Sequence, residues 1–324
     1  MMLKPIVFVL APIVTFAAPL DARAQNYPER PIRFVVTFPP GGSTDFIARI
    51  LAQHLPAALG QSIVIDNRGG GGGNIGCDIV AKAAPDGYTM LFTTEGPMTI
   101  NPSVYAALPF NGMRDLPAIT HLIKYANVVA FNASVPVASV KELIAMAKAQ
   151  PGKLRYGHPG VGTGNHLAVE LFKMMTGVDI ISVPYKGGGP AMIAVAGNES
   201  QFSFATPPSA LPHVKSGRVK AIAVTSAKRS AAMPTLPTVA ESGVPGFEVE
   251  GWVGLFAPAG TPPRILQRMH SEVVKVLRRP DVNELVLAGG SETVGIPIEE
   301  SRTRIRNETA MWAKVVKSTG IKIE

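Results

Sequence analysis

Apolar residues follow two alternating patterns along almost the whole chain. Short apolar runs bounded by turn-forming residues predict strands, and segments with apolar residues at every third or fourth position predict helices. The predicted strands are residues 34–38, 63–65, 88–93, 154–156, 180–183, 202–205, 221–224 and 253–257. The clearest helical segments are residues 46–55, 167–175 and 265–276. This alternation is typical of an α/β protein in which helices flank central sheets.

Several predicted strands end in a glycine-rich turn that leads directly into a helix. These turns are TFPPGGSTD at 37–45, the segment 66–76, YGHPGVGTGNH at 156–166 and YKGGGP at 185–190. The first N–H groups of a helix lack partners and carry partial positive charge, and glycine lets a ligand approach them closely. We interpret the first and third turns as two halves of an anion site. The alternative is that they are ordinary, well-capped turns that bind nothing.

Two features of these turns shape the anion hypothesis. Ser43 or Thr44 can cap the helix after the first turn, and Thr163 or Asn165 the helix after the third. Neither turn contains an arginine, so backbone dipoles rather than bidentate side chains would hold the anion.

The first 24 residues have the pattern of a secretory signal. Lys4 precedes an apolar stretch at 5–19, and Ala22-Arg23-Ala24 is a small-x-small cleavage site. A membrane anchor is the alternative, but the apolar stretch is shorter than the ~20 residues that span a bilayer. We therefore expect cleavage after Ala24 and an exported, periplasmic protein.

The remaining length suits two packed domains or one large one. Proline-rich stretches at 131–139 and 233–245 suggest that the chain leaves one domain, builds a second and returns. We expect residues 25–125 plus 238–324 to form lobe 1, and residues 126–237 to form lobe 2.

Composition excludes several classes of function. The single cysteine, Cys77, rules out an internal disulfide, and the formal charge of +8 comes from scattered basic residues without interleaved aromatic residues, which argues against nucleic acid as a partner. The six histidines show no metal-ligand spacing, and no G-x-S-x-G nucleophile elbow is present. We expect no enzyme activity, no metal and no cofactor.

One motif supports a competing interpretation. Residues 71–76 fit the G-x-G-x-x-G fingerprint of dinucleotide-binding domains, and Glu95 follows at a suitable distance. The export signal and the run of five glycines, which makes a chance match easy, argue against an exported dinucleotide-binding enzyme.

The sequence resembles the substrate-binding receptors of tripartite tricarboxylate transporters, the Bug-type periplasmic proteins, from Tyr27 to the C-terminus. The matching segments, in the family's order, include YPERPIRFVVTFPPGGSTD, NIGCDIVAKAAPDGYTMLF, INPSVYAALPF, GVGTGNHLAVELF, VPYKGGGPA and GLFAPAGTPP. The resemblance implies a monomeric, two-lobed α/β receptor of the Venus-flytrap kind (type II), each lobe a mixed sheet flanked by helices. It also implies that a carboxylate binds in the cleft and is delivered to a permease of one large and one small membrane subunit. A receptor that reports to a sensor kinase is the second possibility.

The resemblance also implies which residues form the binding site. The first binding loop corresponds to 38–45, a second loop to 94–99, and lobe 2 contributes 160–166 with the turns 185–187 and 206–209 nearby. The residues expected to contact the ligand are Phe38, Pro40, Gly41, Gly42, Thr44, Asp45, Thr94, Glu95, Met98, Gly160, Gly162, Thr163, Gly164, Asn165, His166, Tyr185, Gly187, Thr206 and Pro207.

Three short segments depart from the family's pattern: His158-Pro159, Glu95-Gly96-Pro97-Met98 and Thr206-Pro207-Pro208. If the Glu95 carboxylate faces the cleft, it would repel a second ligand carboxylate and favour a hydroxyl, amine or amide donor. The ligand would then be a monocarboxylate or an amino-bearing acid rather than a tricarboxylate. The alternative is that Glu95 points to solvent at the rim.

Overall fold

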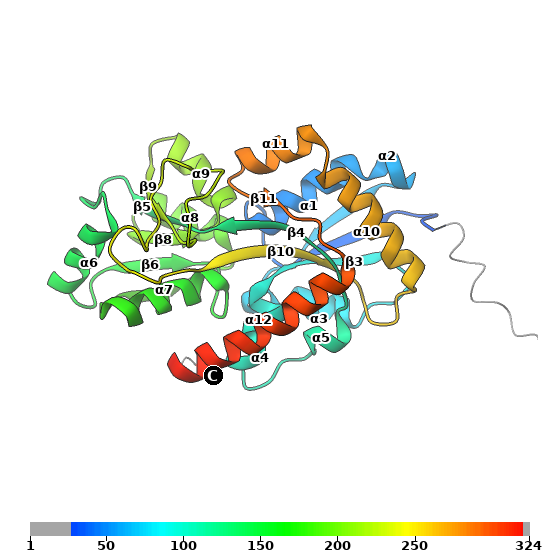
Figure 1. Ribbon diagram of the computed structural model, residues 1–324, viewed down its shortest axis with the longest axis horizontal. Coiled ribbons are helices and arrows are strands. Elements are labelled where there is room, and N and C mark those ends of the chain that lie inside the picture. The colour runs from blue at the N-terminus through cyan, green and yellow to red at the C-terminus, as the bar shows by residue number, and fades with distance from the viewer. Residues whose placement is uncertain (1–26, 320–324) are drawn as a thin grey trace, which may run out of the picture.

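The structure is a computed structural model that describes residues 27–319. The predicted signal and its cleavage site lie outside these residues. The described chain forms two lobes side by side (Figure 1), each built on one mixed sheet with helices on both faces. Among residues 27–319, no helix combines the length and the apolar character needed to cross a membrane.

The first lobe is built on a six-stranded sheet of order β11-β4-β10-β3-β1-β2. Its strands are β1 (Ile32–Val36), β2 (Ile63–Asn67), β3 (Thr89–Thr94), β4 (Ala118–Ala126), β10 (Glu250–Phe256) and β11 (Glu292–Thr293). β1 is parallel to β2 and β3, and β10 is antiparallel to β3 and β4.

Helices cover both faces of this first sheet. One face carries α1 (Ser43–His54), α2 (Pro56–Leu59), α10 (Pro263–Leu277) and α11 (Pro280–Ala288), and the other carries α3 (Asn74–Ala81), α4 (Asn101–Val104), α5 (Gly112–Asp115) and α12 (Ile298–Thr319). The apolar stripe of α1 packs against β1 and β3 in the largest core cluster, as its helical spacing predicts.

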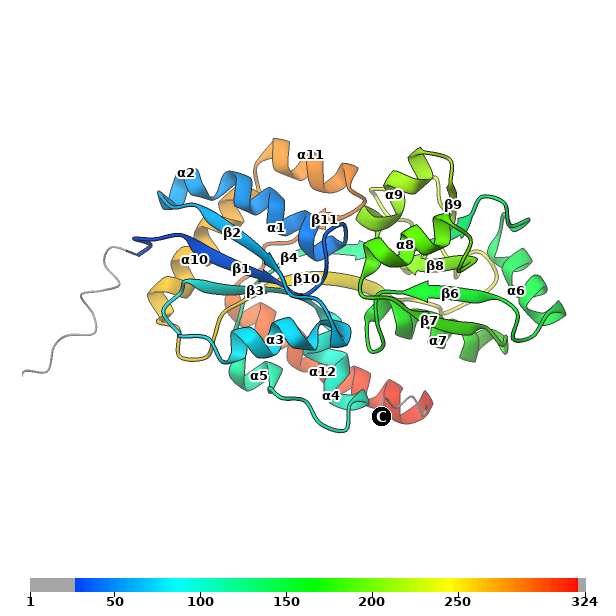
Figure 2. The ribbon, with the colours of Figure 1, turned by 180° about the vertical axis from the view of Figure 1, so that it is seen from behind.

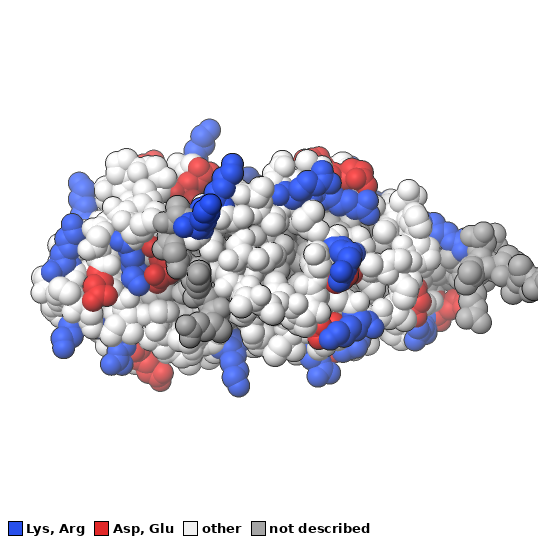
Figure 3. Space-filling view, turned by 90° about the horizontal axis from the view of Figure 1, so that it is seen from below, with Lys and Arg blue, Asp and Glu red and all other residues white. Residues whose placement is uncertain are grey.

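The second lobe is built on a five-stranded sheet of order β7-β6-β8-β5-β9. Its strands are β5 (Val128–Asn132), β6 (Arg155–His158), β7 (Ile181–Pro184), β8 (Phe202–Ala205) and β9 (Val219–Val224). One face is covered by α6 (Val140–Ala149) and α7 (Gly164–Thr176), and the other by α8 (Gly188–Ala196) and α9 (Pro207–Lys215). The charged side chains are scattered over the face shown in Figure 3 and do not gather into one basic patch.

Strands β4 and β5 are a correction to the sequence-based prediction. No strand was predicted between residues 118 and 132, and 131–139 was taken as a segment between domains. β4 is almost completely buried yet contains Thr120, His121 and Lys124, so it shows neither a continuous apolar run nor a polar-apolar alternation. Its position in the sheet, between β10 and β11, decides its conformation.

The chain passes between the lobes at Asn127, where β4 ends and β5 begins, and returns between β9 and β10. Thr225 joins the two connections: its hydroxyl accepts from Asn127 N (2.8 Å) and donates to Val249 O (2.6 Å). Its own backbone N–H donates to Asn127 O (3.0 Å), and Val249 N donates to Thr225 O (2.9 Å). One buried threonine therefore holds both crossing segments in a fixed register.

Replacing Thr225 by valine should lower the free energy of unfolding by about 2–3 kcal/mol, because a buried donor and a buried acceptor each lose a partner. Thr225→Ser keeps the hydroxyl and loses only a methyl group, so it should cost about 1 kcal/mol. Urea unfolding of both variants measures the difference. A serine variant as unstable as the valine variant would show that the hydroxyl is not the stabilising group.

Candidate functional site

A pocket lies between the two lobes and is lined by residues from both. Lobe 1 contributes Phe38, Gly42, Ser43, Thr44, Thr94 and Tyr125, and lobe 2 contributes Pro159, Thr163, Asn165, Gly188 and Thr206. Its empty volume is about 320 Å³ when its opening to solvent is included.

Helix N-termini converge on this pocket. Gly42, Thr163, Gly187 and Thr206 are the N-cap residues of α1, α7, α8 and α9 respectively. Figure 2 shows the start of α1 turned toward the second lobe, where α8 and α9 lie. The partial positive charges of several helices therefore meet in one place, and this favours a negatively charged group there.

The helix α1 presents its first N–H groups to the pocket without a capping side chain. Its N-cap is Gly42, which cannot cap, and in the described part of the chain no acceptor is found for the N–H groups of Ser43 and Thr44. The hydroxyl of Thr44 is also buried without a hydrogen-bond partner. A ligand that accepts hydrogen bonds would satisfy all three donors at once.

The pocket contains no side chain that is charged at neutral pH. No Lys, Arg, His, Asp, Glu or Cys is among its lining residues. The one titratable group is Tyr125, whose pKa is raised well above its usual value by burial and by the nearby Glu95 carboxyl, so its hydroxyl stays protonated. Binding here depends on backbone dipoles and neutral hydroxyl and amide groups.

Glycines let the backbone of each lobe approach the other lobe closely around the pocket. A Cβ at Gly162 (φ +81°) would overlap Asn101 Oδ1, and a Cβ at Gly72 (φ +62°) would overlap Val161 O. A Cβ at Gly189 would lie 2.9 Å from Pro40 O. This closed arrangement of the lobes therefore requires glycine on both sides of the cleft.

Glu95 lies behind the pocket wall and not among the lining residues. Its Oε2 accepts a hydrogen bond from Trp252 N (3.1 Å), and a Cβ at Gly164 would overlap its Oε1, so the carboxyl group lies against the first residue of α7. Glu95 is only 4% exposed, so the expectation that it points to solvent at the rim is wrong. Burial raises the pKa of this carboxyl to about 7.

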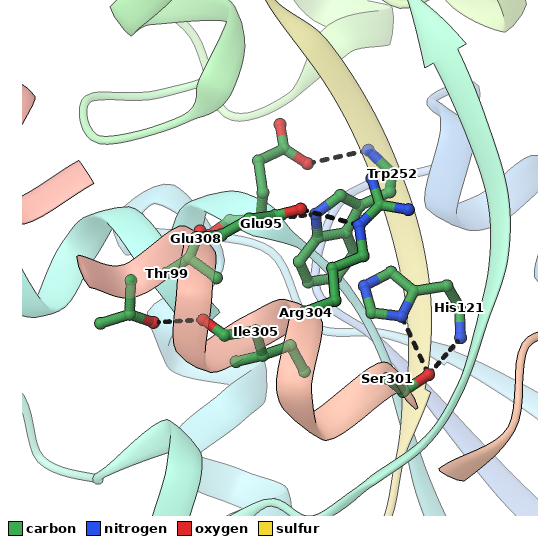
Figure 4. Close-up of polar contacts among 9 residues, drawn as sticks. Glu95, Thr99, His121, Trp252, Ser301, Arg304, Ile305 and Glu308 are labelled. Carbon is green, nitrogen blue, oxygen red and sulfur yellow. Dashed lines mark hydrogen bonds and ion pairs between the residues drawn. The ribbon is translucent and has the colours of Figure 1, made fainter. Parts of the chain in front are cut away.

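Figure 4 shows the polar groups around Glu95. Trp252 Nε1 donates to Glu308 Oε2 (2.7 Å), and Arg304 Nε donates to Glu308 Oε1 (2.8 Å), so Arg304 and Glu308 neutralise each other on α12. Glu95 itself has no cation as a hydrogen-bond partner. His121 Nδ1, which lies near Ser301 Oγ (3.0 Å), belongs to the same side of the lobe.

The structure places seven of the predicted site residues at the pocket: Phe38, Gly42, Thr44, Thr94, Thr163, Asn165 and Thr206. Others shape the junction between the lobes and do not line the pocket, namely Pro40, Gly41, Gly160, Gly162, Gly164 and Gly187. The remaining predicted residues serve contacts within the protein. Asp45 accepts from Arg49 and Asn67, Met98 packs on Gly112, His166 lies against His158, Tyr185 contacts Ser200, and Pro207 packs on Gly290.

His158 and His166 form a neutral pair beneath the second glycine loop, with ring centroids 4.6 Å apart. Gly160 N donates to His158 Nδ1 (3.3 Å), and burial lowers the pKa of His158 to about 3 and that of His166 to about 4. No group of three potential metal ligands is found among the described residues. This pair therefore supports the loop rather than a metal or a charge.

Sequence reasoning missed four lining residues: Ser43, Tyr125, Pro159 and Gly188. Ser43 and Gly188 start helices after glycine-rich turns and could have been included on that basis. Pro159 had been noted only as part of a segment that departs from the family's pattern. Tyr125 gave no signal, because its strand was not predicted.

The family model described as "Tripartite tricarboxylate transporter family receptor" matches residues 47–321. The chain belongs to this receptor family. It is 38% identical to protein BugT of Bordetella pertussis (strain Tohama I) over 309 residues, which cover 95% of this chain and 94% of BugT. The predicted resemblance to the Bug-type receptors is thus confirmed.

Two solved structures of ligand-bound proteins are similar to this receptor over almost their whole length. R. palustris Rpa4515 with adipate is 37% identical with a TM-score of 0.89, covering 91% of this chain and 99% of that one. MatC (Rpa3494) from Rhodopseudomonas palustris with bound malate is 28% identical with a TM-score of 0.85, covering 90% and 100%. The predicted two-lobed receptor fold is confirmed by these neighbours.

Replacing Gly72 (φ +62°) by alanine should keep the lobes of this receptor apart, because its Cβ would overlap the backbone oxygen of Val161 when the cleft is closed. We expect affinity for any acid that closes the wild-type protein to fall at least tenfold, with a larger radius of gyration in small-angle scattering. Gly177→Ala is the matched control: Gly177 ends α7 at φ +67° with open space around it, so the variant carries the backbone strain without the overlap. Equal affinities in the two variants would contradict the closure role.

Glu95→Gln should remove a pH dependence of stability. The folded-state pKa of about 7 lies above the ordinary value of 4.5. The contribution of the Glu95 carboxyl to the stability of the wild-type protein is therefore fully present below pH 4.5 and is lost as the pH rises through 7. The free energy of unfolding of wild type minus that of the variant should therefore fall by about 3 kcal/mol between pH 4.5 and 8. Taking the difference cancels the histidines, which both proteins share, and a pH-independent difference would show that Glu95 is charged in the folded protein.

Proposed function

We propose that this protein is a periplasmic receptor that captures a small organic carboxylate between its lobes and delivers it to a membrane permease of one large and one small subunit. The observation that carries this proposal is the convergence of helix N-termini on a pocket without charged side chains. The unpaired N–H groups of Ser43 and Thr44 and the free Thr44 hydroxyl supply donors for one carboxylate group. The adipate and malate of the two solved neighbours are consistent with this chemistry.

The receptor's action is conformational. A ligand held by α1 of lobe 1 and by α7 and α8 of lobe 2 makes its full set of contacts only when the cleft is closed, so binding stabilises the closed form. The glycine contacts between the lobes form in the same state. A permease can then distinguish the loaded receptor from the empty one by the relative position of the lobes.

Catalysis has no support in the pocket. General acid-base or nucleophilic chemistry needs a titratable side chain beside the substrate, and Tyr125, with its raised pKa, is the only such group in the lining. The dinucleotide alternative also lacks space: the loop 71–76 faces Val161 O, Pro97 and Phe38, and these occupy the position where a pyrophosphate would approach the glycines. A receptor that signals to a sensor kinase would use the same closure, and the effect of deleting the permease on uptake distinguishes the two roles.

A panel of small mono- and dicarboxylic acids should raise the melting temperature of the protein. An acid at ~100 times its dissociation constant adds roughly 2.7 kcal/mol, which corresponds to a shift of about 4 °C for a protein of this size. The matched control is the primary amide of each active acid, which keeps shape but removes the negative charge. Equal shifts for acid and amide, or no shift with any acid, would contradict carboxylate binding.

A further inference from the structure

The polar side chains that lobe 2 presents to the pocket have already used their hydrogens inside the lobe. The clearest case is Asn165, which is 6% exposed. Its Nδ2 donates to Phe204 O (2.7 Å) and to Asn127 Oδ1 (2.8 Å), so both amide hydrogens are engaged. A backbone carbonyl can only accept, and this fixes which end of the amide is nitrogen. The atom of Asn165 left for a ligand is Oδ1, an acceptor.

The hydrogen of the Thr206 hydroxyl is also engaged within lobe 2, in a contact with Ser209. The hydroxyl of Ser209 donates its one hydrogen to Thr206 O (2.8 Å). The contact between Thr206 Oγ1 and Ser209 Oγ (3.0 Å) therefore requires the hydrogen of Thr206. The Thr206 hydroxyl, 6% exposed at the pocket, can then only accept a hydrogen bond from a ligand.

The hydrogen of the Thr163 hydroxyl is likewise engaged within lobe 2. Its hydroxyl donates to Gly160 O (2.7 Å) and accepts from His166 N (3.4 Å), which caps α7. Lobe 1 differs, because the Thr44 hydroxyl keeps its hydrogen and the N–H groups of Ser43 and Thr44 are unpaired. The pocket thus has donors at the helix N-termini and a separate set of side-chain acceptors on lobe 2.

We propose that the ligand carries, besides its carboxylate, a hydroxyl group that donates to Asn165 Oδ1 or Thr206 Oγ1, or an amino group that donates to both. This inference rests on the proposed carboxylate-binding function and narrows it to donor-bearing acids. An acid that lacks the donor would place C–H groups or a second oxygen against two buried acceptors. Those acceptors would lose water without gaining a partner, and an unpartnered buried acceptor weakens binding substantially.

The acceptors that favour a donor-bearing acid are neutral side-chain oxygens of lobe 2 and not the Glu95 carboxylate. The sequence suggested that a Glu95 carboxylate in the cleft would select a donor. In the structure the Glu95 carboxyl lies against Gly164 at the start of α7 and does not line the pocket, and Asn165 and Thr206 present the acceptors instead. The selecting atoms are neutral, so an amino and a hydroxyl donor are both admitted.

The test uses pairs of acids that differ only by one hydroxyl, and a second set that differ only by one amino group, measured by calorimetry. In at least one pair we expect the donor-bearing acid to bind about 10- to 100-fold more tightly than its partner. Whether the hydroxyl or the amino set gives the larger ratio identifies the donor. If acids bind but the donor-free member binds equally well or better in every pair, this inference is wrong while the proposed function stands. If no acid binds, the proposed function itself fails.

Two variants test which atoms cause the preference for donor-bearing acids. Thr206→Val removes one acceptor, so the donor-bearing acid should lose affinity, the donor-free acid should gain affinity, and the ratio between paired acids should fall to about threefold or less. Ser209→Ala lies outside the pocket lining and frees the Thr206 hydrogen to point at the ligand, so it should also reduce the ratio. A substitution that weakens the binding of both acids of a pair equally would show that these residues act through the stability of the protein and do not select the ligand.

Discussion

The unpaired N–H groups at the starts of helices are the constraint around which this receptor is built. A helix cannot satisfy its first N–H groups internally, and here Gly42 at the start of α1 supplies no capping side chain. The same chain brings the starts of α7, α8 and α9 to the same pocket from the other lobe. Because partial positive charges converge without a lysine or an arginine, an anion can bind without the fixed geometry of a guanidinium group.

Closure of the cleft depends on glycines outside the pocket lining. Gly72, Gly162 and Gly189 do not line the pocket; Gly72 and Gly189 let the backbones of the two lobes meet around it, and Gly162 makes room for the Asn101 side chain. These contacts bring protein atoms of both lobes around the pocket, and hydrogen bonds and dipoles are stronger in a less polar environment. The closeness of the lobes and the strength of the anion site are therefore linked.

The pocket is also connected to the point where the chain crosses between lobes. Asn165, which lines the pocket, donates to Asn127, and Asn127 N donates to the hydroxyl of Thr225 in the second connection. The residue that faces the ligand and the residues that join the lobes belong to one buried hydrogen-bond network. A network of this kind holds the acceptor of Asn165 in one orientation, which a surface amide would not keep.

The sequence by itself determined the α/β class, most strands, the glycine turns at helix starts and the family, because these depend on local periodicity and on turn residues with few alternatives. It predicted seven of the pocket residues, all but Phe38 and Thr94 at helix starts. Only the tertiary structure determined β4 and β5. The conformation of a strand that is buried on both faces depends on the strands beside it and not on an apolar-polar alternation in its own sequence. It also decided that Tyr125 lines the pocket while Glu95 lies behind it, because the direction of a side chain at a strand end depends on contacts with β10 and α7, which are distant in sequence.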